Sequence, residues 1–228
     1  MNHTPLDAAS HTPDATNAPV GETATTDLPK ATPPKSKNRF ESAQPVLEKL
    51  FELYPALFGA RFVPLKLGIF QELMAAHPDV FKRNDLKTAL GVHTRSTRYL
   101  QAVASGLKRH DLAGQPVEDV APEHVYLSVV ELFTRRQART EEDLTPKLRN
   151  QLIAAFEASG LARQDYLARI GTPPEAIQTV LDDALDVVEQ RRARHAALRK
   201  AFESSGQSVE AFADMMGMKL TEVKAALA

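Results

Sequence analysis

The chain of 228 residues contains no cysteine. Disulfide bonds and metal sites built on thiolates are therefore excluded. The sequence also lacks an apolar run of about 18 residues, the length that a helix needs to cross a bilayer, so we expect no transmembrane helix and no membrane partner. It does not open on a charged segment followed by an apolar one, so we expect no secretory signal and a cytoplasmic location.

Large apolar residues are scarce over residues 1–38, a segment that holds six prolines. Such a segment cannot bury enough apolar surface to offset the entropy that ordering costs. We therefore expect a disordered N-terminal arm there. A central domain over residues 39–140 and a C-terminal module over residues 141–228 complete the predicted division of the chain.

Net charge is nearly absent, at −1, but the charges are unevenly distributed. Residues 39–140 carry 14 basic and 11 acidic residues, whereas residues 141–228 carry 11 basic and 14 acidic ones. A local basic excess is typical of a surface that binds a polyanion, and a solvated basic face is the alternative. The excess peaks in a stretch with one acid, Asp85, and seven basic residues: Lys82, Arg83, Lys87, Arg95, Arg98, Lys108 and Arg109.

Residue patterns typical of catalysis are lacking as well. The seven histidines show no ligand spacing such as His-x3-His. No glycine-rich phosphate loop follows a predicted strand, and no serine lies in a nucleophile elbow. The acidic pair Asp182-Asp183 is better explained by a solvated helix surface than by acid–base catalysis. We expect a protein that is not an enzyme and that carries neither a metal nor a cofactor.

Hydrophobic periodicity predicts a mainly α-helical central domain. We expect its first four helices over residues 42–54, 64–76, 83–90 and 94–106.

Proline and capping residues indicate where these helices begin and end. We place Pro45 in the first turn of the first helix, Gly91 at the C-cap of the third and Thr94 at the N-cap of the fourth. Residues 107–121 predict two short strands around a glycine turn, and residues 122–140 predict a further amphipathic helix.

The last third of the chain contains an internal repeat with an offset of 46 residues. Phe-Glu-Ala-Ser-Gly at residues 156–160 matches Phe-Glu-Ser-Ser-Gly at residues 202–206. The same offset aligns Tyr166 with Phe212, Ile170 with Met216, Gly171 with Gly217, and Ile177 with Val223. Each copy predicts a helix, a Ser-Gly stop, a short helix, a glycine turn and a third helix. We expect a duplicated, helix-turn-helix-like C-terminal module.

The spacing within each copy fits a DNA-binding helix-turn-helix. A DNA reader also needs a basic recognition helix, whereas the first copy places Glu175, Asp182 and Asp183 there. We therefore favour a structural or protein-docking role for this module. A DNA-binding regulator, or an adaptor that docks a protein partner through residues 141–228, is the alternative to a function of the central domain.

Several motifs of the central domain occur in a characteristic order. Residues 64–73, Pro-Leu-Lys-Leu-Gly-Ile-Phe-Gln-Glu-Leu, precede Leu86-Lys87-Thr88-Ala89-Leu90 and Thr94, then Arg98-Tyr99-Leu100, and then Arg109-x-Asp-Leu-x-Gly. This order resembles the ProQ/FinO family of bacterial RNA chaperones over about residues 40–140. The resemblance implies a ProQ/FinO-like helical domain with a short β-hairpin.

The resemblance also implies a partner and a function. The partner would be structured RNA, especially intrinsic-terminator hairpins with single-stranded U-rich 3′ ends in small regulatory RNAs and mRNAs. The function would be to stabilise small RNAs and to promote RNA–RNA pairing in post-transcriptional regulation. Carried over by position, and extended along the basic stretch, the RNA-binding residues would be Lys66, Arg83, Lys87, Arg95, Arg98, Tyr99, Lys108 and Arg109.

We expect different tasks for these residues. Tyr99 and Arg109 would hold the terminal nucleotides. The phosphates of the hairpin stem would be contacted by Arg83, Lys87 and Arg98. The chain departs from the family at Gly91, His93 and Thr97, where relatives often carry basic or aromatic residues.

Overall fold

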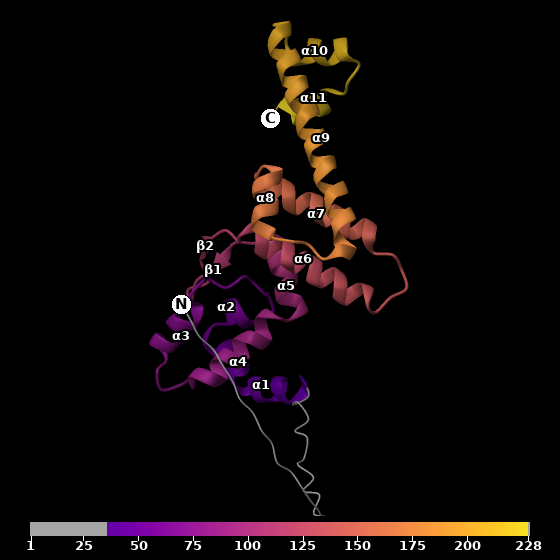
Figure 1. Ribbon diagram of the computed structural model, residues 1–228. Coiled ribbons are helices and arrows are strands. Elements are labelled where there is room, and N and C mark those ends of the chain that lie inside the picture. The colour runs from indigo at the N-terminus through magenta and orange to yellow at the C-terminus, as the bar shows by residue number, and fades with distance from the viewer. Residues whose placement is uncertain (1–35, 228) are drawn as a thin grey trace, which may run out of the picture. The chain divides into compact units, whose positions relative to one another are not determined.

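The computed structural model describes residues 36–227. Within them the chain is mainly helical and contains one two-stranded antiparallel sheet (Figure 1). The predicted fold class is therefore confirmed. The predicted disordered arm falls almost wholly on residues 1–35, which lie outside the described residues.

Short connections join most of the helices and strands. The central part contains α1 (Ser36–Leu53), α2 (Pro55–Phe58), α3 (Ile69–Ala76), α4 (Arg83–Thr94), α5 (Thr97–Ala104), β1 (Arg109–His110), β2 (Pro116–Glu118) and α6 (Pro122–Gln137). The C-terminal part contains α7 (Thr145–Ser159), α8 (Arg163–Ile170), α9 (Glu175–Ser205), α10 (Val209–Met216) and α11 (Leu220–Leu227). No helix within the described range is long and apolar enough to cross a membrane.

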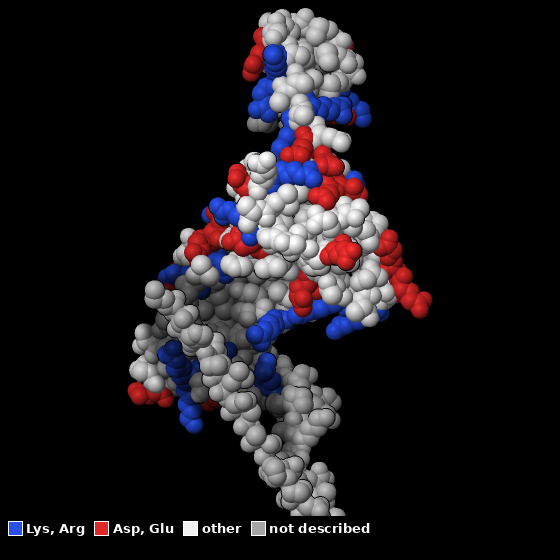
Figure 2. Space-filling view, in the orientation of Figure 1, with Lys and Arg blue, Asp and Glu red and all other residues white. Residues whose placement is uncertain are grey.

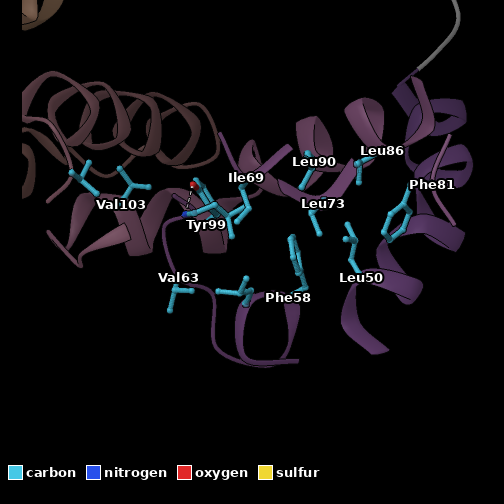
Figure 3. Close-up of a cluster of buried hydrophobic side chains, with 13 residues drawn as sticks. Leu50, Phe58, Val63, Ile69, Leu73, Phe81, Leu86, Leu90, Tyr99 and Val103 are labelled. Atoms are coloured by element: carbon cyan, nitrogen blue, oxygen red, sulfur yellow. Dashed lines mark hydrogen bonds between the residues drawn. The ribbon is translucent and has the colours of Figure 1, made fainter. Parts of the chain in front are cut away.

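The first core lies between α1, α3, α4 and α5 (Figure 3). On α4 the buried residues recur at the spacing of one helix face: Leu86, Ala89, Leu90 and His93,. Leu50 of α1 is fully buried against this face, since α1 packs along α4. The apolar stripe of α4 thus fixes where the basic residues on its other side are presented.

His93 is the polar member of this buried face. Its ring is stacked on Phe62 at a centroid distance of 4.8 Å and lies 4.9 Å from Phe58 and 5.4 Å from Tyr99. The buried Nε2 atom has no hydrogen-bond partner among the described residues. Burial lowers the pKa of His93 to about 4, so the imidazole is neutral at physiological pH,.

Two predicted helix boundaries are wrong near the first core. Helix α1 begins at Ser36, so Pro45 lies inside the helix and not in its first turn. Proline removes one intrahelical hydrogen bond, and the exposed position of Pro45 leaves the freed carbonyl accessible to water,. Helix α4 continues through Gly91 to Thr94, because its buried stripe extends to His93.

The helix predicted from Pro64 begins only at Ile69. Residues 64–66 are extended instead, and Leu65 forms a parallel bridge with His110 of β1. The His110 amide donates to the Pro64 carbonyl, and the Lys66 amide donates to the His110 carbonyl, both at 2.8 Å. Gly68, at φ 85°, then turns the chain into α3,.

The N-cap of α5 is Ser96 and not Thr94. The Ser96 hydroxyl accepts a hydrogen bond from the Tyr99 amide at 3.2 Å, as expected for an N-cap side chain. The Thr94 hydroxyl donates back to the Leu90 carbonyl at the end of α4. The predicted hairpin is confirmed, with Gly114 at φ 74° in its turn.

The predicted duplication is confirmed in detail. The bounds of α8 and α10 differ by the repeat offset of 46 residues. The Phe156–Tyr166 ring pair, with centroids 5.0 Å apart, recurs as Phe202–Phe212 at 5.3 Å. Helix α9 is shared: its first half is the third helix of one copy, and its second half is the first helix of the other (Figure 1).

Helix α6 contributes to the packing on both sides of the predicted boundary at residue 140. It packs against α5 and also against α7 and α8. Tyr126 and Val129 of α6 belong to the buried cluster of the first repeat copy. The division into a central domain and a separate C-terminal module stays a prediction.

Two glycine substitutions should shift stability in opposite directions. Gly91→Ala should raise the free energy of unfolding by about 0.5–1 kcal/mol, because Gly91 is helical,. An added Cβ there would meet only Arg95 Nη1, at 3.7 Å. Gly68→Ala should lower it by about 1–2 kcal/mol, because φ is +85°,. Chemical denaturation followed by circular dichroism measures both, and equal effects of the two variants would contradict this account.

The buried His93 should make stability depend on pH. The pKa of His93 is about 4 in the folded chain against an ordinary value of 6.5, so protonation favours unfolding. The stabilisation is complete above pH 6.5 and is lost as pH falls towards 4,. Between about pH 7.5 and about pH 5, the wild type should lose about 2 kcal/mol more than His93→Phe. Parallel losses in denaturation experiments would contradict the prediction.

Candidate nucleic-acid interface

Two side chains of the candidate site hold one peptide segment. The Tyr99 hydroxyl accepts a hydrogen bond from the Leu65 amide at 3.0 Å, and Arg109 Nη1 donates to the Leu65 carbonyl at 3.0 Å (Figure 3 shows the Tyr99 contact). Arg109 also donates to His124 Nδ1 at 3.0 Å, and its Nε atom lies 3.9 Å from Glu118 Oε1. We call this arrangement the Leu65 clamp.

Both clamp side chains are largely buried. Tyr99 is 7% exposed and Arg109 is 8% exposed. Burial raises the pKa of the Tyr99 phenol, and Arg109 opposes this shift,. The phenol is therefore protonated at neutral pH. The predicted contact of Tyr99 and Arg109 with RNA stays a proposal, and the structure gives both residues a positioning role.

Two arginines of the basic stretch are exposed and lie over aromatic rings. The Arg98 guanidinium carbon is 4.8 Å from the Phe62 ring centroid, and Arg98 Nη2 donates to the Ala60 carbonyl at 2.8 Å. The guanidinium carbon of Arg83 is 5.4 Å from the Phe70 ring centroid. A cation over a ring face is held by the ring quadrupole, so both charges are kept in place at the surface.

The exposed Lys87 lies one turn after Arg83 on α4, and the exposed Arg95 follows at the end of that helix. Within residues 36–227, no ion pair is formed by Arg83, Lys87, Arg95 or Arg98. We call these four residues the unpaired basic set. Their positive charge is available to a polyanion.

Two of the predicted residues are neutralised by acids. Lys66 Nζ lies 2.5 Å from Glu72 Oε1, and this hydrogen bond is the main reason that the pKa of Lys66 is raised. Lys108 Nζ lies 3.5 Å from Asp119 Oδ1, with both side chains exposed. A phosphate at either lysine must therefore compete with a carboxylate.

The structure adds residues that the sequence reasoning missed. Phe62 supports Arg98, and Glu118 and His124 hold Arg109. Their roles depend on contacts between segments far apart in the chain, for which the local sequence gives no signal. No group of three or more His, Asp or Glu side chains suited to a metal ion occurs within the described part of the chain.

The first repeat copy has an acidic surface, which is unfavourable for the alternative that this module binds DNA. Arg163 of α8 is paired with three carboxylates on the first half of α9, those of Asp182, Asp186 and Glu189. With Glu175 and Asp183, these acids make the first half of α9 strongly acidic, since residues 175–190 contain no Lys or Arg. A DNA duplex would therefore be repelled at this helix.

Removing the Tyr99 hydroxyl should test the clamp. Tyr99→Phe leaves the buried Leu65 amide without its acceptor, which should lower the free energy of unfolding by about 1–3 kcal/mol,. Chemical denaturation measures the loss. Tyr54→Phe is a control for removing a half-buried tyrosine hydroxyl whose partner is a histidine side chain. A Tyr99→Phe variant as stable as the wild type would contradict the clamp.

The site geometry can now be compared with known proteins. A model of the ProQ/FINO family matches residues 40–145. RNA chaperone ProQ of Shewanella oneidensis is 36% identical over 95 residues, which are 40% of this chain and 45% of that protein. RNA chaperone ProQ of Shewanella frigidimarina is 30% identical over 137 residues, 57% of this chain and 67% of that protein. The chain thus spans about half the length of the first relative and two thirds of the second.

A solved structure is also similar in sequence. NMB1681 of Neisseria meningitidis, a FinO-like RNA chaperone, is 33% identical and aligns over 39% of this chain and 90% of its own, with a TM-score of 0.35. Both Shewanella relatives are named as RNA chaperones. The family match covers the Leu65 clamp and the unpaired basic set, and the chain belongs to the ProQ/FinO family.

Proposed function

We propose that this chain is an RNA chaperone that binds RNA through the unpaired basic set. The observation that carries the proposal is that four exposed cations in the part of the chain matched by the family model have no acidic partner within residues 36–227. Protein surfaces ordinarily mix charges of both signs. The names of the matched relatives support RNA as the polyanion.

Phosphate neutralisation supplies the affinity in this proposal. An A-form stem is recognised by its shape and its phosphates, because its deep major groove is closed to side chains. Arg83 and Arg98 suit this task because their guanidinium groups are held over rings and lose little freedom on binding,. Lys87 and Arg95 add charge on the same segment, whereas Lys66 and Lys108 must first give up their carboxylates.

Selectivity for a 3′ end is the finer part of the proposal. The preferred RNA is an intrinsic-terminator hairpin with a single-stranded U-rich tail. The N-terminus of α5, capped by Ser96, presents backbone amides beside Arg98, and such amides favour phosphate,. Tyr99 and Arg109 position the Leu65 segment below this point and offer only their small accessible edges to a terminal nucleotide.

The biological role follows from this mode of binding. A protein that covers the 3′ ends of small RNAs and mRNAs protects them from 3′ exonucleases. It also brings two RNAs together for pairing, which is post-transcriptional regulation in the cytoplasm. No covalent step is required, so the chain acts by binding alone.

Removing single charges should weaken RNA binding in a salt-dependent way. Lys87→Ala and Arg98→Ala should each lower the affinity for a terminator hairpin and reduce the slope of log K against log salt by about 0.7–0.9. Arg199→Ala on α9 is the matched control, because it removes one exposed arginine outside the central domain. Fluorescence anisotropy at several salt concentrations measures both quantities. Wild-type affinity and slope in both test variants would overturn the proposal.

A further inference from the structure

The second half of α9 is basic, although the first half of the same helix is acidic. Residues 175–189 carry five acidic residues and neither Lys nor Arg, whereas residues 190–202 carry five basic residues and neither Asp nor Glu. The basic ones are Arg191, Arg192, Arg194, Arg199 and Lys200. Exposed helices are stabilised when opposite charges lie four residues apart. Because the two signs are separated along α9, the repulsion among its cations is not relieved within the helix.

The basic segment begins where α9 is most exposed. From Glu189 to Ala197, every residue except the half-buried His195 is exposed. A helix that is polar on all sides is typical of a connection through solvent, and α9 is shared by the two repeat copies. Figure 2 shows Lys and Arg side chains gathered at the level of α11 and acidic ones on the stretch of α9 nearer α7 and α8. A large ligand can therefore reach the basic segment without displacing a described helix.

Four of the five cations form no ion pair within residues 36–227, namely Arg192, Arg194, Arg199 and Lys200. Arg191 is the exception, since its Nη1 atom lies 2.5 Å from Glu157 Oε1. The guanidinium carbon of Arg192 lies 4.7 Å from the Phe156 ring centroid, and Arg192 Nη1 donates to the Leu161 carbonyl at 2.8 Å. The charge of Arg192 is thus held in place at the surface but is not neutralised.

Three of these cations share one face of α9. Arg192, Arg199 and Lys200 occupy positions i, i+7 and i+8 of the helix, and the exposed Ala196 lies between them at i+4,. Arg192 and Arg199 are about 10 Å apart along the helix axis, because each residue adds about 1.5 Å. The small side chain of Ala196 leaves room for a phosphate backbone between the two arginines. We call Arg192, Arg199 and Lys200 the α9 basic face.

Acidic residues limit this face at both ends. Glu189, which is paired with Arg163, precedes the face, and Glu203 follows it one turn after Arg199. The acidic first half of α9 lies between the α9 basic face and the central domain in the chain. An RNA that followed the chain from the unpaired basic set to this face would have to pass these carboxylates, which repel phosphate. The α9 basic face therefore suits a separate RNA molecule.

We propose that the α9 basic face binds the phosphate backbone of a second RNA while the unpaired basic set holds the first. The proposal rests on the RNA binding proposed for the central domain. Contacts to phosphates carry no sequence information, so the second RNA is bound without selection for its bases. Two RNAs on one chain meet at a raised effective concentration, and the cations lower the repulsion between their backbones. This face thus gives the chain a physical means of promoting RNA–RNA pairing.

Saturating the chain with one RNA isolates the second site. The full chain is first saturated with an unlabelled terminator hairpin. A fluorescent single-stranded RNA that cannot pair with the hairpin is then titrated into this complex. Fluorescence anisotropy should show saturable binding of the second RNA without release of the hairpin. A second RNA that is complementary to the hairpin should pair with it faster when the chain is present.

Removing two charges from the face should affect only the second RNA. Arg199→Ala combined with Lys200→Ala should leave the hairpin affinity unchanged and weaken binding of the second RNA. The slope of log K against log salt for the second RNA should fall by about 1.4, the value for two lost contacts to a single strand. Lys219→Ala combined with Lys224→Ala removes two exposed cations of the same repeat copy that lie outside the face, and it should leave binding of the second RNA unchanged.

Adding an acid tests the same face without removing a cation. Ala196→Glu places a carboxylate between Arg192 and Arg199, and it should weaken binding of the second RNA and slow the pairing reaction. Ala197→Glu makes the same change at the next exposed position, which lies on another side of the helix, and it should have a clearly smaller effect. Glutamate and alanine are both favourable in helices, and circular dichroism confirms that each variant is folded.

Three results would overturn the inference. The first is that the hairpin-saturated chain binds no second RNA. The second is that the test variants bind the second RNA as tightly as their controls do. The third is that a polyglutamate peptide binds the face, with a loss in Ala196→Glu, while RNA does not, which would assign the face to an acidic protein. Hairpin binding without a second RNA defeats this inference alone, whereas a wild type that binds no hairpin defeats the proposed function as well.

Discussion

The Leu65 clamp is the interaction on which the candidate site depends. A buried backbone group without a partner costs about 1–3 kcal/mol, and Leu65 has its amide and its carbonyl satisfied by the side chains of Tyr99 and Arg109. These bonds join the extended segment 64–66 to α5 and to the hairpin. Arg98 is the neighbour of Tyr99 on α5, so the same bonds also fix the position of Arg98. A surface charge is thus fixed by buried polar contacts beneath it.

The central part and the C-terminal part of the described chain differ in how their charges are paired. Among residues 36–227, Arg83, Lys87, Arg95 and Arg98 have no acidic partner, which suits a polyanion. The first repeat copy instead neutralises Arg163 with three carboxylates and is closed by its long third helix. The second copy keeps the same fold, and the groove between its α9 and α11 is lined by basic, polar and apolar side chains. The net charge of the whole chain, −1, therefore does not reveal that its surfaces differ in chemistry.

Patterns that depend on neighbours in sequence could be predicted, whereas contacts across the fold could not. The repeat offset placed α8 and α10 correctly because matching residues build matching helices. The extended segment at Leu65 was predicted as helix, since its partners lie 34 and 44 residues away. For the same reason, the sequence predicted Arg109 as an RNA-binding residue but did not reveal that its side chain is buried. Residue type alone does not distinguish a guanidinium bound to a buried carbonyl from one that faces solvent.

The central claim is that this chain recognises the 3′ end of structured RNA. The most direct measurement compares the affinity of the full chain for one terminator hairpin with a U-rich tail that ends either in a 3′-hydroxyl or in a 3′-phosphate. The account predicts tight binding of the hydroxyl form and a large loss of affinity for the phosphate form. Equal affinity for the two forms would contradict it, because the basic residues would then bind RNA without recognising its end.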